Sequence, residues 1–400
     1  MRQSLNRNYT VVCYLLLRFL NSFAMSLTGS VYILFLRSLG LNQLQAQMVN
    51  FGFFTGMFLF EIPTGALADA WGRKRALVLS AVLATTASFL YFRAHTMAGC
   101  VVAELCFSIG VTLCNGTLDA WLTDRLTLEG KSKDKIRSTI HTGSVIRNLA
   151  GICAGMLGAY IATFGLNKPF FACGLVFALT GIISIFGLQE GKRKKVSLKR
   201  AVCLIPRGVH YAWQHQGVRF LMLLSIVQFM AIQAPNMQWQ PFFQRHVPSL
   251  LWLGLLKTGI TVSLLLGACL TPLLKKLHES SRLLVIIQIM TGLLVIGTVL
   301  AGSFELSVAA FLLHEILRGL FDPLYQSQLN DHIKNPRIRA TVLSCGSLGK
   351  DLGGMIGLPL SGYLALHDAF TLSWTVSGMF MVVMTLLLAR GIWYITKSDS

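Results

Sequence analysis

Ionisable residues lie inside long apolar stretches of this sequence, where a charge is costly. Glu61 stands about nine residues before the end of the apolar stretch 48–70, or roughly 13 Å deep at 1.5 Å per helical residue. Such a charge costs several kcal/mol unless it is paired or faces water, so each one is a functional candidate. Glu61 could exchange a proton during a reaction cycle, or it could hydrogen bond to backbone that Pro63 leaves unpaired.

The stretch 305–327 carries the densest group of charges. Glu315, Arg318 and Asp322 follow i,i+3 and i,i+4 spacing, which places all three on one helix face. They could neutralise one another, or Glu315 could exchange a proton while a substrate competes for Arg318. His314 and Arg318 are candidate contacts of a substrate cavity. His314 would point about 100° away from Glu315 on a helix, a poor arrangement for an acid–base dyad.

Two other stretches carry polar residues that fit a substrate cavity. Arg18 and Asn21 share one face of 11–36, where Arg18 could bind an anion or pair with a carboxylate. The stretch 217–244 is rich in amides and contains two prolines, which free backbone carbonyls. Broken, polar spans are typical of transporter substrate sites, although a packed kink would look similar. Its candidate contacts are Gln228, Gln233, Asn236 and Trp239.

The two halves of the sequence repeat several unusual residues. Asp119 and Asp322 each end a Gly-x-x-Asp sequence, and they are 203 residues apart. Recurrence within one chain favours structural ion pairs, so we expect Asp119 to pair with Arg147 and Asp322 with Lys350. Parallel repeats of six spans are typical of transporters whose halves rock about a central site. The same offset joins Gly143 to Gly346, Arg147 to Lys350 and Gly151 to Gly354.

The composition requires a membrane to position these residues. Of 400 residues, 54% are hydrophobic and 13% are charged, with mean hydropathy +0.62, whereas soluble domains carry about 25% charged residues. A membrane span takes about 20 helical residues. Twelve such stretches are predicted at roughly 11–36, 48–70, 76–94, 97–121, 139–164, 169–188, 217–244, 250–274, 281–301, 305–327, 340–364 and 369–393.

Lys and Arg concentrate in alternate connections between these stretches, for example 73–75, 131–137 and 192–200. Membrane proteins keep such residues in the cytoplasm, which predicts that both termini are cytoplasmic. The same bias explains the net charge of +19 without nucleic acid. The outer connections hold only Arg37, Arg93, Lys168 and Arg245.

These patterns predict an all-α membrane protein of twelve transmembrane helices in two pseudo-symmetric halves. The halves are 1–190 and 217–400, joined by a cytoplasmic linker at 191–216. Nine cysteines occur singly in apolar surroundings, without metal-ligand spacing. We therefore expect no metal and no cofactor, and a monomer in the lipid bilayer.

The connection after the second stretch reads Gly65-Ala-Leu-Ala-Asp69-Ala70-Trp-Gly72-Arg73-Lys-Arg. It resembles the signature loop of the major facilitator superfamily, Gly-x-Leu-x-Asp-Arg-x-Gly-Arg-Lys-Arg, with Ala70 in place of a basic residue. Gly65 would permit close helix approach, and Gly72 would permit a tight turn. The resemblance implies that Gly65, Asp69, Gly72 and Arg73 latch the two halves in the outward-open state. It also implies that the first, fourth, seventh and tenth spans line the cavity.

The longer sequence Glu61-Ile-Pro63-Thr-Gly65 resembles bacterial drug:proton antiporters of the third type. Their fifth-span motif is incomplete here, because Met156 stands where proline is expected, and the direction of transport stays open. We therefore expect rocker-switch transport of a small organic solute, coupled to protons through Glu61 or Glu315, in the cell (inner) membrane. Multidrug or metabolite efflux fits this interpretation. A lipid or lysolipid flippase on the same fold is the alternative; a membrane-embedded enzyme lacks any visible catalytic motif.

Overall fold

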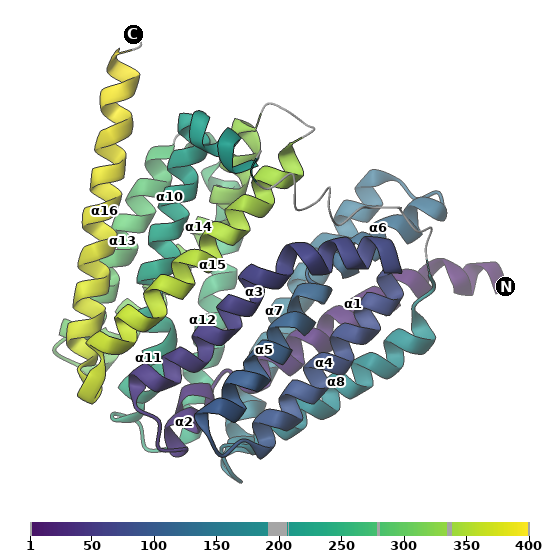
Figure 1. Cartoon of the computed structure of the whole chain (residues 1–400), viewed down its shortest axis with the longest axis horizontal. Coiled ribbons are helices and arrows are strands. Elements are labelled where there is room, and N and C mark those ends of the chain that lie inside the picture. Colours follow the sequence, from purple (N-terminus) through teal and green to yellow (C-terminus); the bar gives the residue numbers. More distant parts are fainter. Residues whose placement is uncertain (1, 191–205, 207, 278–280, 334–337, 399–400) are drawn as a thin grey trace. The chain divides into compact units, whose positions relative to one another are not determined.

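The computed structural model describes all residues except 1, 191–205, 207, 278–280, 334–337 and 399–400 (Figure 1). Every regular element in the described part is helical. The predicted linker at 191–216 lies largely outside the described residues. The helices are α1 (Arg2–Leu27), α2 (Tyr32–Ser38), α3 (Gln43–Trp71), α4 (Arg73–Arg93), α5 (Met97–Cys114), α6 (Thr117–Leu128), α7 (Lys133–Ala162), α8 (Lys168–Gly187), α10 (Gln216–Ala231), α11 (Gln233–Gln244), α12 (Leu250–Leu270), α13 (Ser281–Leu300), α14 (Phe304–His332), α15 (Arg339–Leu364) and α16 (Phe370–Ser398), with short 3₁₀ helices at Thr271–Leu277 and Leu366–Asp368.

The predicted all-α membrane architecture is confirmed. Ten helical stretches in the described part of the chain are long and apolar enough to cross a membrane. The other two predicted spans are α14 and α15, with 29 and 26 residues. Both carry charged residues in their middle, which lowers their hydropathy without shortening the helix.

Two of the predicted spans are interrupted, one at a glycine and one near a proline. α5 and α6 are separated at Gly116, whose φ of 68° is left-handed and suits glycine. This break places Asp119 in the first turn of α6, where backbone N–H groups favour a negative charge. α10 ends at Ala231, four residues before Pro235, because a proline ring clashes with the carbonyl at i−4.

The chain divides into two compact units. Unit 1 comprises Met1–Leu39, Thr55–Val202 and Val247–Thr258, and unit 2 comprises Gly40–Phe54, Cys203–His246 and Gly259–Ser400. α3 and α12 therefore each contribute residues to both units.

Each unit has its own apolar core. Unit 1 packs α1 against α6 through buried Leu17, Trp121 and Leu122, and unit 2 packs α10 against α14 through Leu224 and Phe321, among others. Small residues permit close helix packing in a membrane. These cores hold the helices that carry the charged residues.

Close packing of α1 on α7 in unit 1 depends on a glycine. A Cβ added at Gly158 would overlap the backbone carbonyl of Leu27. Direct backbone contact of this kind is possible only where the side chain is absent. The crossing fixes α7 beside α1 and so positions the polar residues of both helices.

Candidate functional site

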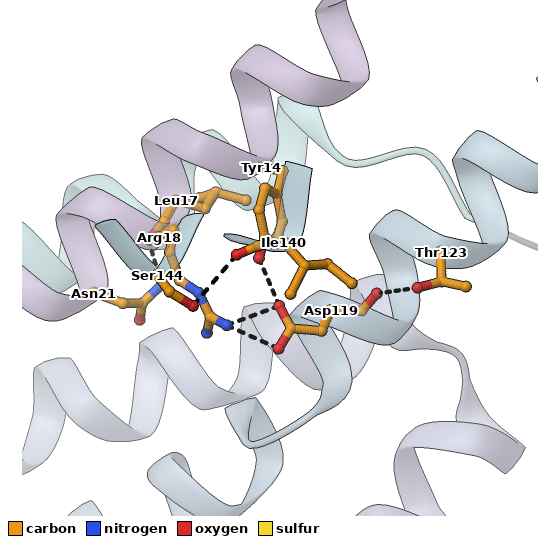
Figure 2. Close-up of polar contacts among 8 residues, drawn as sticks. All are labelled: Tyr14, Leu17, Arg18, Asn21, Asp119, Thr123, Ile140 and Ser144. Carbon is orange, nitrogen blue, oxygen red and sulfur yellow. Dashed lines mark hydrogen bonds and ion pairs between the residues drawn. The ribbon is translucent and has the colours of Figure 1, made fainter. Parts of the chain in front are cut away.

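The first charged cluster lies in unit 1 and centres on Asp119 (Figure 2). One terminal nitrogen of Arg18, Nη2, donates to both carboxylate oxygens of Asp119 at 2.8 Å each. The hydroxyl of Tyr14 donates to Oδ1 of Asp119 at 2.7 Å. Tyr14 is fully buried, whereas the Arg18 and Asp119 side chains are 20% and 33% exposed. The cluster is thus anchored in the core and partly open to solvent.

Arg18 replaces Arg147 as the ion-pair partner of Asp119, so the predicted Asp119–Arg147 pair is wrong. The i,i+4 spacing of Tyr14 and Arg18 places both on the face of α1 that meets Asp119. Arg147 is an exposed residue of α7 and interacts electrostatically with Arg18 and Asp119. Its carbonyl accepts a hydrogen bond from Ser22 at 2.8 Å, which fixes this turn of α7 beside α1.

Asn21 is the second cavity candidate on α1. It lies near Arg18 in Figure 2, but its amide nitrogen donates to the Leu17 carbonyl of its own helix at 2.8 Å. A local bond of this kind satisfies one amide donor. Its role as a substrate contact stays a prediction.

The second charged cluster lies in unit 2 on α14. Arg318 Nη1 lies 3.1 and 3.2 Å from the Glu315 carboxylate oxygens and 2.7 Å from Oδ1 of Asn236 on α11. Glu315 is 3% exposed, whereas Arg318 is 28% exposed. His314 is fully buried, and its Nε2 lies 3.4 Å from Glu315 Oε1, closer than the 100° helical separation suggested. A buried carboxylate is thus held between an imidazole and a solvent-accessible cation.

The predicted ladder of three charges on α14 is divided in the structure. Asp322 turns to Lys350 of α15, whose Nζ lies 2.6 Å from Oδ1. The ammonium also lies 4.8 Å from the centre of the Tyr325 ring and 5.1 Å from that of Phe229, a favourable cation–π geometry. Glu315 and Asp322 therefore each have a different cation.

The amide-rich span, α10 and α11, contributes buried polar groups to unit 2. Gln228, Gln233 and Trp239 are each at most 5% exposed. Gln233 donates to the Phe229 carbonyl at 2.9 Å. Within the described residues, the amide atoms of Gln228 make no hydrogen bond. A buried amide of this kind can orient a polar solute.

Gln238 belongs to the same amide-rich span but is not among the candidate contacts predicted from the sequence. Its nitrogen donates to Ser361 and Ser373 at 3.0 Å each, and its oxygen accepts from Trp374 at 3.0 Å. The amide ties α11 to α15 and α16. Its position among the other glutamines is a weak signal, because spacing alone does not separate a structural amide from a substrate contact.

The signature loop forms a network inside unit 1. Arg73 lies 2.9 Å from Asp124 of α6 and 3.7 Å from Asp69. Gly72 has φ 114°, and a Cβ there would overlap the Glu190 carboxylate. The close approach expected at Gly65 is absent, since an added Cβ would meet no described atom within 4 Å.

Glu61 is half-buried in α3. Thr64, one turn later, donates to the carbonyls of Phe60 and Glu61 at 2.7 and 3.2 Å. They do not replace the bond lost at Pro63, because proline has no N–H and the carbonyl left without its helical donor is that of Leu59. Across the described residues, no group of three His, Cys, Asp or Glu side chains is placed to hold a metal.

Paired charges on neighbouring membrane-length helices within each unit are typical of polytopic α-helical transporters. The sequence model of the Major Facilitator Superfamily matches residues 14–288, and the chain belongs to that superfamily. It is 22% identical over 395 residues to the uncharacterized MFS-type transporter YxaM of Bacillus subtilis, covering 94% of this chain and 92% of the relative. It is 23% identical over 328 residues to the multi-drug resistance efflux pump PmrA homolog of Lactococcus lactis, covering 76% and 75%.

Solved structures share the fold. The nucleoside transporter NupG matches with a TM-score of 0.79 at 13% identity, over 95% of this chain and 98% of that one. The D-xylose-proton symporter matches with a TM-score of 0.74 at 14% identity, over 95% and 96%. At such low identity these matches support the fold alone.

Proposed function

We propose that this protein is a proton-coupled secondary transporter that moves a small organic solute by rocker-switch motion of its halves, 1–190 and 217–400. It works as a monomer in the cell (inner) membrane with both termini in the cytoplasm. The observation that supports proton coupling is the buried Glu315 carboxylate bonded to the partly exposed Arg318. Membrane-embedded carboxylates of this kind are typical of proton relays.

The arrangement around Glu315 supports an exchange between proton and solute. Ionised Glu315 holds Arg318 at 3.1 Å, and protonation removes the charge that holds it. Arg318 keeps its bond to Asn236, so it stays in place and becomes available to a solute. His314 is the other titratable group at Glu315, and Asp322, two turns away on α14, is bound to Lys350.

Gln228, Gln233 and Trp239 are the proposed solute contacts on the neighbouring span, because they are buried polar or aromatic groups on α10 and α11. Amide and indole N–H groups fix the orientation of a bound solute, while the aromatic surface removes it from water. The Lactococcus lactis relative is a multi-drug resistance efflux pump homolog, and this similarity supports efflux as the direction.

The test compares Glu315→Gln with Glu61→Gln in proteoliposomes under an imposed pH gradient. Glutamine keeps the size of glutamate but cannot titrate. We expect Glu315→Gln to abolish gradient-driven accumulation while solute exchange without a gradient continues. Glu61 is the second coupling candidate, so Glu61→Gln tests the alternative carboxylate in the same assay, and we expect it to keep gradient-driven accumulation. Accumulation with unchanged pH dependence in folded Glu315→Gln would transfer the role to Glu61 or remove proton coupling.

A further inference from the structure

The cluster in unit 1 contains more positive than negative charge. Arg18 and Arg147 both interact electrostatically with Asp119, and Asp119 is bonded to Arg18 alone of the two. Among the described residues of unit 1, no carboxylate lies within ion-pair distance of Arg147. In unit 2, by contrast, Arg318 and Lys350 each have their own carboxylate.

Arg147 lies on α7 beside this cluster. It stands about eight residues into the predicted span 139–164, or roughly 12 Å deep. Its residue surface is exposed, and its backbone is bonded to Ser22, which lies one turn after Arg18 on the same face of α1. A guanidinium at that depth requires an anionic partner or water. Because the cluster's carboxylate is already bound to Arg18, an anionic partner for Arg147 would be a bound solute.

The chemistry of the two arginines selects the partner. A guanidinium presents parallel N–H donors that match both oxygens of a carboxylate or phosphate. Arg18 uses Nη2 for Asp119, and its Nη1 turns away from that carboxylate in Figure 2. Arg147, which interacts electrostatically with Arg18, and Nη1 of Arg18 are therefore the donors that this cluster offers to a further anion.

We propose that the transported solute is an organic anion, carrying a carboxylate or phosphate group, and that it has a further binding site in unit 1, distinct from the contacts proposed in unit 2, at Arg147 with Arg18 as the second cation. The proposal rests on the proposed transport function and names its substrate class. Asp119 serves as the positioning residue, because it fixes the Arg18 guanidinium while leaving the cluster with one net positive charge.

The experiment uses the full chain in proteoliposomes and pairs of solutes of similar shape. The pairs are benzoate with benzamide, lactate with lactamide, and glycerol 3-phosphate with glycerol; tetraphenylphosphonium and ethidium represent organic cations. Uptake rates are measured for the native chain, Arg147→Gln, Arg147→Lys and Arg93→Gln. Arg93 is an exposed arginine at the end of α4 and provides the control for removing one positive charge.

We expect the native chain to take up each anion faster than its neutral counterpart. Losing a charge-assisted bond reduces affinity about tenfold or more, so Arg147→Gln should raise the half-saturating anion concentration by that factor. The half-saturating concentration of Arg147→Lys should lie between those of the native chain and Arg147→Gln. An ammonium keeps the positive charge but cannot donate two parallel bonds to one anion. Arg93→Gln should match the native chain.

The outcomes separate this inference from the proposed function. Uptake confined to neutral solutes or cations would leave a working transporter and overturn the anion assignment. Anion uptake with unchanged half-saturation in Arg147→Gln would also overturn it. If no solute moves under any gradient, the transport function itself fails, and the substrate assignment fails with it.

Discussion

Replacing Asp119 with asparagine removes the negative charge between two arginines. The carboxylate accepts two bonds from Arg18 at 2.8 Å and one from Tyr14 at 2.7 Å. The asparagine amide nitrogen would face an Arg18 donor, so at least one of these bonds is lost. Charge-assisted bonds contribute about 1.5–3 kcal/mol each. The Arg18 and Asp119 side chains are 20% and 33% exposed, so hydrogen bonds to water replace part of the lost stabilisation. We therefore expect Asp119→Asn to lower the free energy of unfolding by about 2 kcal/mol.

The electrostatic part of this loss can be isolated with Arg147. Asp119→Asn leaves Arg18 and Arg147 as two cations without an anion in the cluster, and removing Arg147 relieves their repulsion. We therefore expect Asp119→Asn/Arg147→Gln to recover about 1 kcal/mol relative to Asp119→Asn. The control is Asp119→Asn/Arg93→Gln, which should recover nothing because Arg93 lies at the end of α4.

Thermal unfolding in detergent measures these differences through a dye that reacts with thiols as they become exposed. Cys13, Cys100 and Cys173 are free and buried, so they report loss of the unit 1 core. Asp119→Asn should lower the midpoint by roughly 2–4 °C. Equal midpoints for the Arg147 and Arg93 double variants would refute the idea that Arg147 belongs electrostatically to this cluster.

Three further predictions concern packing, the signature loop and topology. Gly158→Ala should destabilise unit 1 by about 2 kcal/mol or more in the same thiol assay, because the added Cβ would overlap Leu27. Gly65→Ala is the control and should be tolerated, because its Cβ meets no described atom. Equal unfolding midpoints for the two variants would contradict the packing account. Asp69→Asn should leave the unfolding midpoint unchanged, since the Asp69–Arg73 distance is 3.7 Å and Asp69 is 42% exposed, but should slow uptake; native uptake would show that the loop has no latch role. A cysteine introduced near Gly40 should react with an impermeant thiol reagent in intact cells, and one near Lys194 should not; labelling near Lys194 would reverse the proposed topology.

Hydropathy was sufficient to predict the helical architecture. Each span must be long and apolar, and both properties can be read from one continuous segment of the sequence. The break at Ala231 follows from Pro235, and the left-handed residue at 116 is a glycine, so both kinks have local causes. The chemistry of single residues therefore explains the secondary structure.

The ion-pair partners depend on which helices are neighbours, and the sequence repeat predicted only one of the two pairs correctly. Asp322 and Lys350 pair as the repeat suggested, whereas Asp119 binds Arg18 of α1. The repeat conserves the aspartate but not the helix that supplies its cation. The i,i+4 pair Tyr14 and Arg18 was the available signal, because both groups share one face and can converge on a carboxylate.

The central claim is proton-coupled transport, and proton movement driven by a solute tests it most directly. Proteoliposomes loaded with a pH-sensitive dye, with equal pH on both sides, receive a solute that the native chain transports. We predict that solute entry changes the internal pH in the native protein and that Glu315→Gln transports the solute without this change. Solute entry without any pH change in the native protein would contradict the account, because the carboxylate held by Arg318 would then carry no proton across the membrane.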